Sequence, residues 1–147
     1  MDAKILSENR KARFDYEIKE TIEAGIELRG FEVKSAKAGR MGIVGSHVIV
    51  RGNEAWLVNA QLPPYQQNNT PADYDPSRTR RLLLHKKEIA HITGILKEKS
   101  ASLIPLRVIV KKGIVKIELG LGRARKKRDK RELLKKRAAD REMRSAR

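Results

Sequence analysis

The chain has 147 residues, of which 39% are hydrophobic and 35% are charged, so it can enclose one modest core with appendages but not two cores. Its formal net charge of +16 at pH 7 would cause self-repulsion unless a polyanion neutralised it, which makes nucleic acid the expected partner ahead of an anionic membrane. The absence of cysteine excludes disulfides, thiolate catalysis and Cys-based zinc sites.

Membrane and targeting segments are not expected. The sequence has no run of about 18 apolar residues and no apolar stretch behind a basic N-terminus, which argues against a transmembrane helix and a signal peptide. We therefore expect a cytoplasmic protein without a membrane partner.

The N-terminal part is expected to be a basic arm followed by a long strand. Residues 1–13 carry four basic side chains and few apolar ones, which predicts an arm that packs only partly. Apolar and polar residues then mostly alternate from Phe14 to Leu28, and this period of two is typical of a strand with one buried face. The spacing of apolar residues after Gly30 predicts a short amphipathic helix that ends near Gly39.

Two hairpins are expected in the middle of the chain. Residues 47–62 contain two β-rich runs around Gly52-Asn53, a pair suited to a tight turn. A second pair of runs, 103–110 and 114–121, flanks a turn that contains Gly113, and Pro105 predicts an edge position or a bulge.

The segments between the hairpins differ in character. Residues 63–81 are rich in Pro, Asn and Asp, which predicts a long functional loop. Residues 85–99 are expected to form a helix, because Ile89, Ile92 and Leu96 follow the spacing of one helical face. One long strand, two hairpins and short flanking helices favour a mainly β fold, a small antiparallel OB-like barrel. We expect residues 1–122 to form this domain.

Residues 123–147 are expected to form a basic tail. They contain 13 basic and four acidic residues and carry +9 of the net charge. With no aromatic or β-branched residue, the tail has too little apolar area to offset the entropy of ordering, so we expect disorder in the free protein. Its composition nevertheless favours helix, and we predict that RNA induces a helix from about Asp129 to Arg144.

Candidate contact residues lie in the loop and on the long strand. Arg78, Arg80 and Arg81 end the loop just before an apolar run, either as RNA contacts or as part of a solvated loop. Glu23 lies on the charged face of the strand, where it either forms a surface ion pair or accepts hydrogen bonds from bases or a ribose hydroxyl.

Catalytic and metal sites are not expected. His85 and His91 are six residues apart, unlike the i, i+4 spacing of a helical metal pair, and no P-loop, Rossmann glycine pattern or paired acidic motif occurs. We expect a protein that is not an enzyme and has no cofactor. The few aromatic residues favour recognition of folded RNA by shape over stacking on single strands.

The sequence closely resembles the SmpB family of tmRNA-binding proteins. The resemblance rests on NRKARFDYEI, EAGIELRGFEVKSAKAGR, YDPSRTRRLLLHKKEI, the LIPL run and KKRDKRE in the tail. It implies an OB-like barrel with a tail that is unstructured in the free protein. It also implies an adaptor that binds the tRNA-like domain of tmRNA and delivers it to stalled ribosomes for trans-translation, with elongation factor Tu as a partner through the tmRNA complex.

The resemblance also assigns residues. It implies that Asn9, Glu23 and Leu83 bind the tRNA-like domain together with basic neighbours, which we take to be Arg10, Lys11, Arg13, Lys34, Arg78, Arg80 and Arg81. It implies that the tail probes the decoding centre and the empty mRNA channel through Arg125, Lys126, Lys127, Arg128, Asp129, Lys130 and Arg131.

Two tail positions depart from the family pattern. Ala124 stands where glycine is common, and Arg128 stands where an aromatic residue or histidine is common. The second departure puts a stacking role in doubt, although a guanidinium can also lie flat on a base. The alternatives are a general basic ribosomal protein or RNA chaperone and, less favoured, a nuclease.

Overall fold

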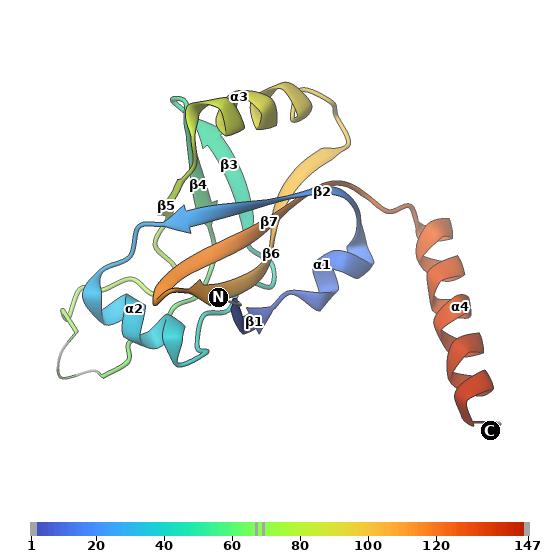
Figure 1. The fold of residues 1–147 in the computed structure, drawn as a ribbon, viewed down its shortest axis with the longest axis horizontal. Helices are drawn as coiled ribbons and strands as arrows, with labels where there is room; N and C mark the ends of the chain where they lie inside the picture. The colour runs from blue at the N-terminus through green and yellow to red at the C-terminus, as the bar shows by residue number, and fades with distance from the viewer. Residues whose placement is uncertain (1–2, 67, 69, 146–147) are drawn as a thin grey trace.

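The computed structural model describes residues 3–66, 68 and 70–145 (Figure 1). Its strands are β1 (Lys4–Glu8), β2 (Tyr16–Ile26), β3 (His47–Arg51), β4 (Glu54–Val58), β5 (Arg80–Leu83), β6 (Ala101–Lys111) and β7 (Ile114–Ala124). Its helices are α1 (Arg10–Asp15), α2 (Gly30–Lys37), α3 (Lys86–Ile95) and α4 (Lys127–Ser145). Residues 1–2, 67, 69 and 146–147, which belong to the predicted arm, loop and tail, lie outside the described residues.

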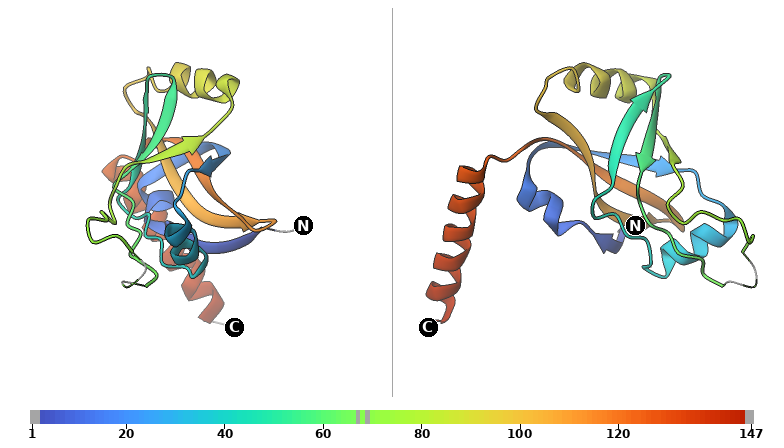
Figure 2. Two further views of the ribbon diagram at one scale, coloured as in Figure 1. Left: turned by 90° about the vertical axis from the view of Figure 1, so that its left-hand side faces the viewer. Right: turned by 180° about the vertical axis from the view of Figure 1, so that it is seen from behind.

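The strands form one antiparallel sheet in the order β1-β6-β7-β2-β5-β4-β3. The long strands β2, β6 and β7 lie side by side and cross the molecule, and the sheet curls so that β3 also contacts β6 (Figures 1 and 2). This curvature encloses a single main core. The prediction of a mainly β, antiparallel, barrel-like fold is confirmed.

Both predicted hairpins are confirmed, with turns that the sequence chemistry explains. Gly52 and Asn53 have φ angles of 61° and 59°, as a two-residue turn with two left-handed positions requires. The β6–β7 turn has φ angles of 49° at Lys112 and 77° at Gly113. The register of these two strands shifts between Pro105 and Arg107, which confirms the predicted irregularity at the proline.

The main core lies inside the curled sheet and is closed by helices. Leu57, Ile117 and Leu119 are fully buried from the sheet side, and Ala36 of α2 and Ile92 of α3 pack on the same core. The predicted helix over 85–99 is therefore present as the shorter α3, with Ile89 and Ile92 buried and Leu96 partly buried. The predicted short amphipathic helix is present as α2.

The arm and the loop contain elements that the sequence patterns did not predict. Residues 4–8 form the edge strand β1, and residues 10–15 form α1, so the long strand begins at Tyr16 and ends at Ile26. Arg80 and Arg81 belong to β5, which pairs with β2 and β4. These two arginines are therefore held in the sheet, and the prediction of a loop through residue 81 is wrong at its end.

The C-terminal segment leaves the sheet as a helix. β7 continues to Ala124, just beyond the boundary expected after residue 122, and α4 projects away from the sheet in Figures 1 and 2. The helix overlaps the predicted range of 129–144. Its dependence on RNA stays a prediction.

The close approach of β7 to β2 at Gly122 allows the packing of the sheet to be tested by substitution. A Cβ atom on Gly122 would lie 2.3 Å from the backbone oxygen of Glu17, whereas Gly94 on α3 has open space around it. We expect Gly122→Ala to lower the free energy of unfolding by about 1–3 kcal/mol through overpacking. Gly94→Ala should raise it by up to about 1 kcal/mol. Urea denaturation of both variants measures this, and equal effects would contradict the packing described here.

Candidate nucleic-acid interface

A hollow of about 510 Å³ lies between β2, β5 and the start of α3. Glu23, Arg81, Leu83 and Lys116 are among the residues that line it, and we call it the β2–β5 groove. Gly25 of β2 is opposite Leu83 of β5 in the sheet register, which explains how segments 60 residues apart in sequence meet. Three of the predicted RNA-binding residues, at positions 23, 81 and 83, are thus brought together.

Glu23 supplies a negative group with positive neighbours. Lys111 donates a hydrogen bond to one carboxylate oxygen, and Lys116 lies 3.2 Å from the other. The hydrogen bond from Lys111 lowers the pKa of Glu23 despite the opposing effect of partial burial. The carboxylate is therefore ionised at neutral pH and lies beside two ammonium groups.

Leu83 and Arg81 present an apolar and a cationic group to the same groove. The side chains of β5 alternate, with Arg80 and Leu82 buried and Arg81 and Leu83 exposed. Leu83 is 47% exposed, which is high for a large apolar residue in a strand. Arg81 lies 2.8 Å from Glu54 and 3.6 Å from Glu27.

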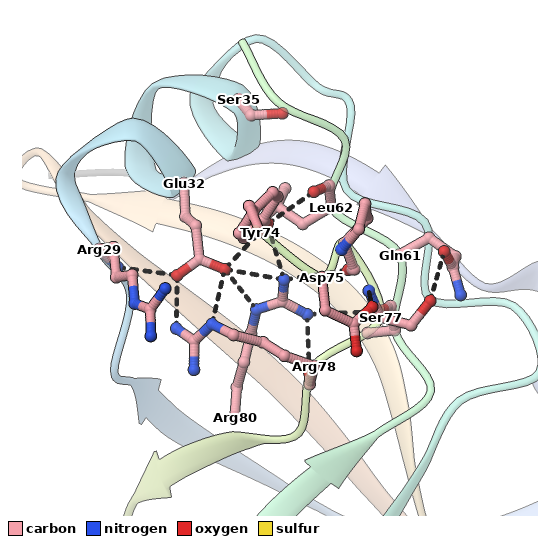
Figure 3. A network of polar contacts seen from close by, with 12 residues as sticks. Arg29, Glu32, Ser35, Gln61, Leu62, Tyr74, Asp75, Ser77, Arg78 and Arg80 are labelled. Atoms are coloured by element: carbon pink, nitrogen blue, oxygen red, sulfur yellow. Dashed lines mark hydrogen bonds and ion pairs between the residues drawn. The ribbon is translucent and has the colours of Figure 1, made fainter. Parts of the chain in front are cut away.

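Arg80 is a structural residue that lies inside the fold and not on the surface of the groove, and its predicted contact with RNA stays a prediction. Its side chain is fully buried, and its Nε–H donates to Glu32 of α2 at 2.8 Å. The Nη groups donate to the backbone oxygens of Ala60, Pro76 and Arg78 and to the hydroxyl of Tyr74. All five N–H donors are thereby used within the protein (Figure 3).

Glu32 is the anionic centre of this buried cluster. Its carboxylate accepts hydrogen bonds from Arg78, Arg80 and the hydroxyl of Tyr74, and from the backbone N–H of Arg29 at 2.9 Å (Figure 3). Desolvation would raise the pKa of Glu32, but the arginine and backbone hydrogen bonds outweigh it and lower the pKa from 4.5 to about 2. Arg78 is mostly engaged here, with 24% of its side chain exposed.

Asn9 has a structural role in this fold, and its predicted role in RNA binding stays a prediction. The residue is 3% exposed. Its Oδ1 caps α1 by accepting from the N–H of Ala12 at 3.1 Å, and its Nδ2 donates to the carbonyl of Pro105 at 3.0 Å. Asn9 therefore fixes α1 against β6, and both ends of its amide group are occupied within the protein.

The other predicted basic residues lie away from the β2–β5 groove. Arg10, Lys11 and Arg13 are exposed on α1, where Arg10 pairs with Glu8 and Arg13 lies 3.4 Å from Glu118. Lys34 is exposed on α2. The structure places these cations on different elements and does not gather them with Glu23 and Leu83.

The tail residues divide into two groups. Lys126, Lys127, Arg128, Asp129 and Arg131 are exposed, whereas Arg125 and Lys130 are partly buried. The N–H of Lys126 lies 3.4 Å from the Asp129 carboxylate, and Arg128 pairs with Glu132 at 3.6 Å. α4 is thus a long, predominantly basic rod with few apolar side chains.

Lys111 and Lys116 were missed by the sequence analysis. Their positions on either side of the β6–β7 turn carry no motif, and only the pairing of β6 with β7 and of β7 with β2 brings them to Glu23. Lys86 at the start of α3 also lines the groove.

Within the described residues, no group of three or more His, Cys, Asp or Glu side chains is arranged to hold a metal ion. None of the helices described is long and apolar enough to span a membrane.

The buried cluster makes the stability of the fold depend on Glu32. Since the folded-state pKa of Glu32 is depressed from 4.5 to about 2, its contribution is complete above about pH 4.5 and is lost as the pH falls toward 2. Glu32→Gln should lower the free energy of unfolding at pH 7 by about 3–5 kcal/mol, because two arginines lose their counter-charge. The variant should also lose less stability than the wild type between pH 4.5 and 2.

Denaturant unfolding at several pH values measures both effects. Glu98→Gln, at an exposed carboxyl, is the control and should behave as the wild type. A Glu32→Gln curve that runs parallel to that of the wild type would contradict the ionised state of the buried Glu32.

Comparisons with known proteins agree with this arrangement. The family model described as SmpB protein matches residues 6–147. An SsrA-binding protein of Gloeothece citriformis is 46% identical over 143 residues, which cover 97% of this chain and 92% of that protein. An SsrA-binding protein of Microcystis aeruginosa is 48% identical over 140 residues, covering 95% and 91%.

A solved structure has the same fold. It is described as "tmRNA-SmpB: a journey to the center of the bacterial ribosome", and its matching chain has a TM-score of 0.68 and 43% identity, with 82% of this chain and 85% of that chain covered. Together with the family match over nearly the full length, these similarities establish that the chain belongs to the SmpB family.

Proposed function

We propose that the chain binds the tRNA-like domain of tmRNA and delivers it to stalled ribosomes for trans-translation. The observation that carries this proposal is the β2–β5 groove, where Glu23 and Leu83 lie at one hollow. The family resemblance implied a joint role for these two residues. Family membership and the relatives described as SsrA-binding proteins support the same RNA.

The chemistry of the groove suits a folded RNA. An ionised carboxylate accepts hydrogen bonds from base amino groups or a ribose 2′-hydroxyl, which lysine and arginine cannot do. The exposed Leu83 offers an apolar surface to a base, and the cations of Arg81 and Lys116 lie close enough to meet phosphates. We infer that the groove recognises local RNA shape, and that the cations contribute affinity without sequence information.

The tail has a separate role in this proposal. Residues 1–122 act as the RNA-binding domain, and residues 123–147 act as a tail that probes the decoding centre and the empty mRNA channel. Its excess of positive charge supports ordering by RNA, because phosphates relieve repulsion between like charges along α4. Elongation factor Tu is expected to join through the tmRNA complex, in the cytoplasm, and the chain acts as an adaptor without catalysis.

The groove gives a direct test of RNA binding. Leu83→Asp and Glu23→Ala should each weaken tmRNA binding about tenfold or more, since each removes or opposes a contact in the groove. Ile5→Asp is the matched control, because Ile5 is a similarly exposed apolar residue, 43% exposed, on the edge strand β1. This substitution should leave the affinity for tmRNA unchanged. Filter binding in physiological salt with bulk tRNA as competitor measures this. Equal competition by tRNA would favour a general RNA chaperone.

Removal of the tail separates the two roles. A chain truncated before Arg125 should retain tmRNA affinity within about threefold but lose tagging of incomplete proteins on stalled ribosomes. Its affinity should also depend less on salt, because fewer phosphate contacts release counterions. Binding titrations at two salt concentrations and a reconstituted tagging assay measure these effects. Loss of tmRNA affinity equal to that of Leu83→Asp would contradict the division of roles.

A further inference from the structure

Two residues at the end of α1, Phe14 and Asp15, contact the tail helix α4 and the chain that leads into it. Asp15, the last residue of α1, lies 3.1 Å from the ammonium group of Lys130. Its backbone oxygen accepts the N–H of Arg125 at 2.8 Å. The exit of the chain from β7 and the first turn of α4 are therefore both held by one residue of the barrel.

Phe14 makes the second set of contacts with α4. The Nζ of Lys130 lies 5.8 Å from the centre of the Phe14 ring, and the guanidinium carbon of Arg137 lies 5.6 Å from it. Both distances are within the range of cation–π attraction. Lys130 and Arg137 are seven residues apart, so they lie on one face of the helix. That face is turned toward the barrel.

The other tail cations remain accessible. Lys127, Arg128 and Arg131 are exposed, whereas Lys130 is only 34% exposed in its side chain. Cation–π and partly exposed ion pairs are individually weak. They are too weak to fold a segment of such high like charge by themselves, but they are sufficient to choose one orientation for a helix that RNA stabilises.

We propose that Phe14 and Asp15 are positioning residues for the tail. They bind Lys130 and Arg137 and so set the direction in which α4 leaves the barrel, while the exposed cations of α4 meet ribosomal RNA. This inference rests on the proposed function of the tail, and it assigns Lys130 of the tail motif to orientation of the helix.

The test measures the direction of the tail within the full chain. Because the sequence has no cysteine, Ala90→Cys on α3 and Ala138→Cys on α4, both exposed, accept a pair of spin labels. The distance distribution is recorded for the free protein and for its complex with tmRNA on stalled ribosomes. Phe14→Leu keeps an apolar side chain without the aromatic face, and Asp15→Asn removes the charge at nearly constant size.

We expect one narrow distance for the wild type in the ribosome-bound complex. Phe14→Leu and Asp15→Asn should each increase the width of the distance distribution about twofold and slow tagging about threefold. The affinity for tmRNA should stay unchanged. Glu17→Gln is the control, because Glu17 is an exposed carboxylate two residues away that pairs with Lys19, and it should match the wild type.

The failures are distinguishable. If Phe14→Leu and Asp15→Asn keep the narrow distance of the wild type, or if the bound wild type shows only a broad distribution, the positioning role is wrong. If the wild type binds tmRNA but supports no tagging, the proposed function of the tail is wrong.

Discussion

The buried Arg80–Glu32 cluster determines which side of β5 faces outward. Because side chains alternate along a strand, burial of Arg80 places Leu82 in the core and turns Arg81 and Leu83 to the surface. A shift by one residue would bury Arg81 without acceptors and would expose the cluster of α2 to water. The orientation of the residues in the β2–β5 groove thus depends on a charge pair that is fully buried.

The same cluster connects three parts of the chain that have little else in common. Glu32 comes from α2, and Tyr74 and Arg78 come from the loop before β5 (Figure 3). Arg80 also donates to the carbonyl of Ala60 after β4. Removal of one partner of a buried ion pair lowers the free energy of unfolding by much more than an exposed ion pair contributes to it. A loop rich in Pro, Asn and Asp is in this way anchored to the sheet by polar contacts, and the ring of Tyr74 also packs edge-on against Phe31 of α2.

Charge is distributed differently in the two parts of the molecule. In and beside the sheet, several cations have nearby carboxylates: Arg13 of α1 and Arg107 of β6 contact Glu118, and Lys111 and Lys116 contact Glu23. In the tail, +9 of the net charge is carried by residues 123–147. A surface on which cations are paired with carboxylates suits selective contact with one folded RNA, whereas a helix with a large excess of positive charge suits contact with phosphates at high density.

Much of the fold was predictable because its signals are local. The alternation in β2, the Gly52-Asn53 turn and the spacing of Ile89 and Ile92 each reflect a period or a turn preference that a short window contains. The first two elements were missed for a different reason. Asn9 is itself a local capping signal, but α1 has only six residues, and the Asn9 amide also donates to the carbonyl of Pro105, 96 residues away. That contact, like the pairing of β1 with β6, leaves no local pattern.

The candidate site was only partly predictable for the same physical reason. Glu23 and Leu83 were named through the family resemblance, and strand pairing then explains why they meet. Arg80 and Arg81 are adjacent and chemically identical, so composition cannot tell which one is buried; only the carboxylate of Glu32, 48 residues earlier, decides it. The proximity of Lys111 and Lys116 to Glu23 could not be predicted from the sequence, because it results from the pairing of β6 with β7 and of β7 with β2.

We propose that this scaffold presents a groove selective for one RNA. Sequencing of the RNA that copurifies with the full chain from cells at native abundance is the decisive test. We expect a single tmRNA to dominate the recovered reads. Recovery of transfer and ribosomal RNAs in proportion to their cellular abundance would contradict it.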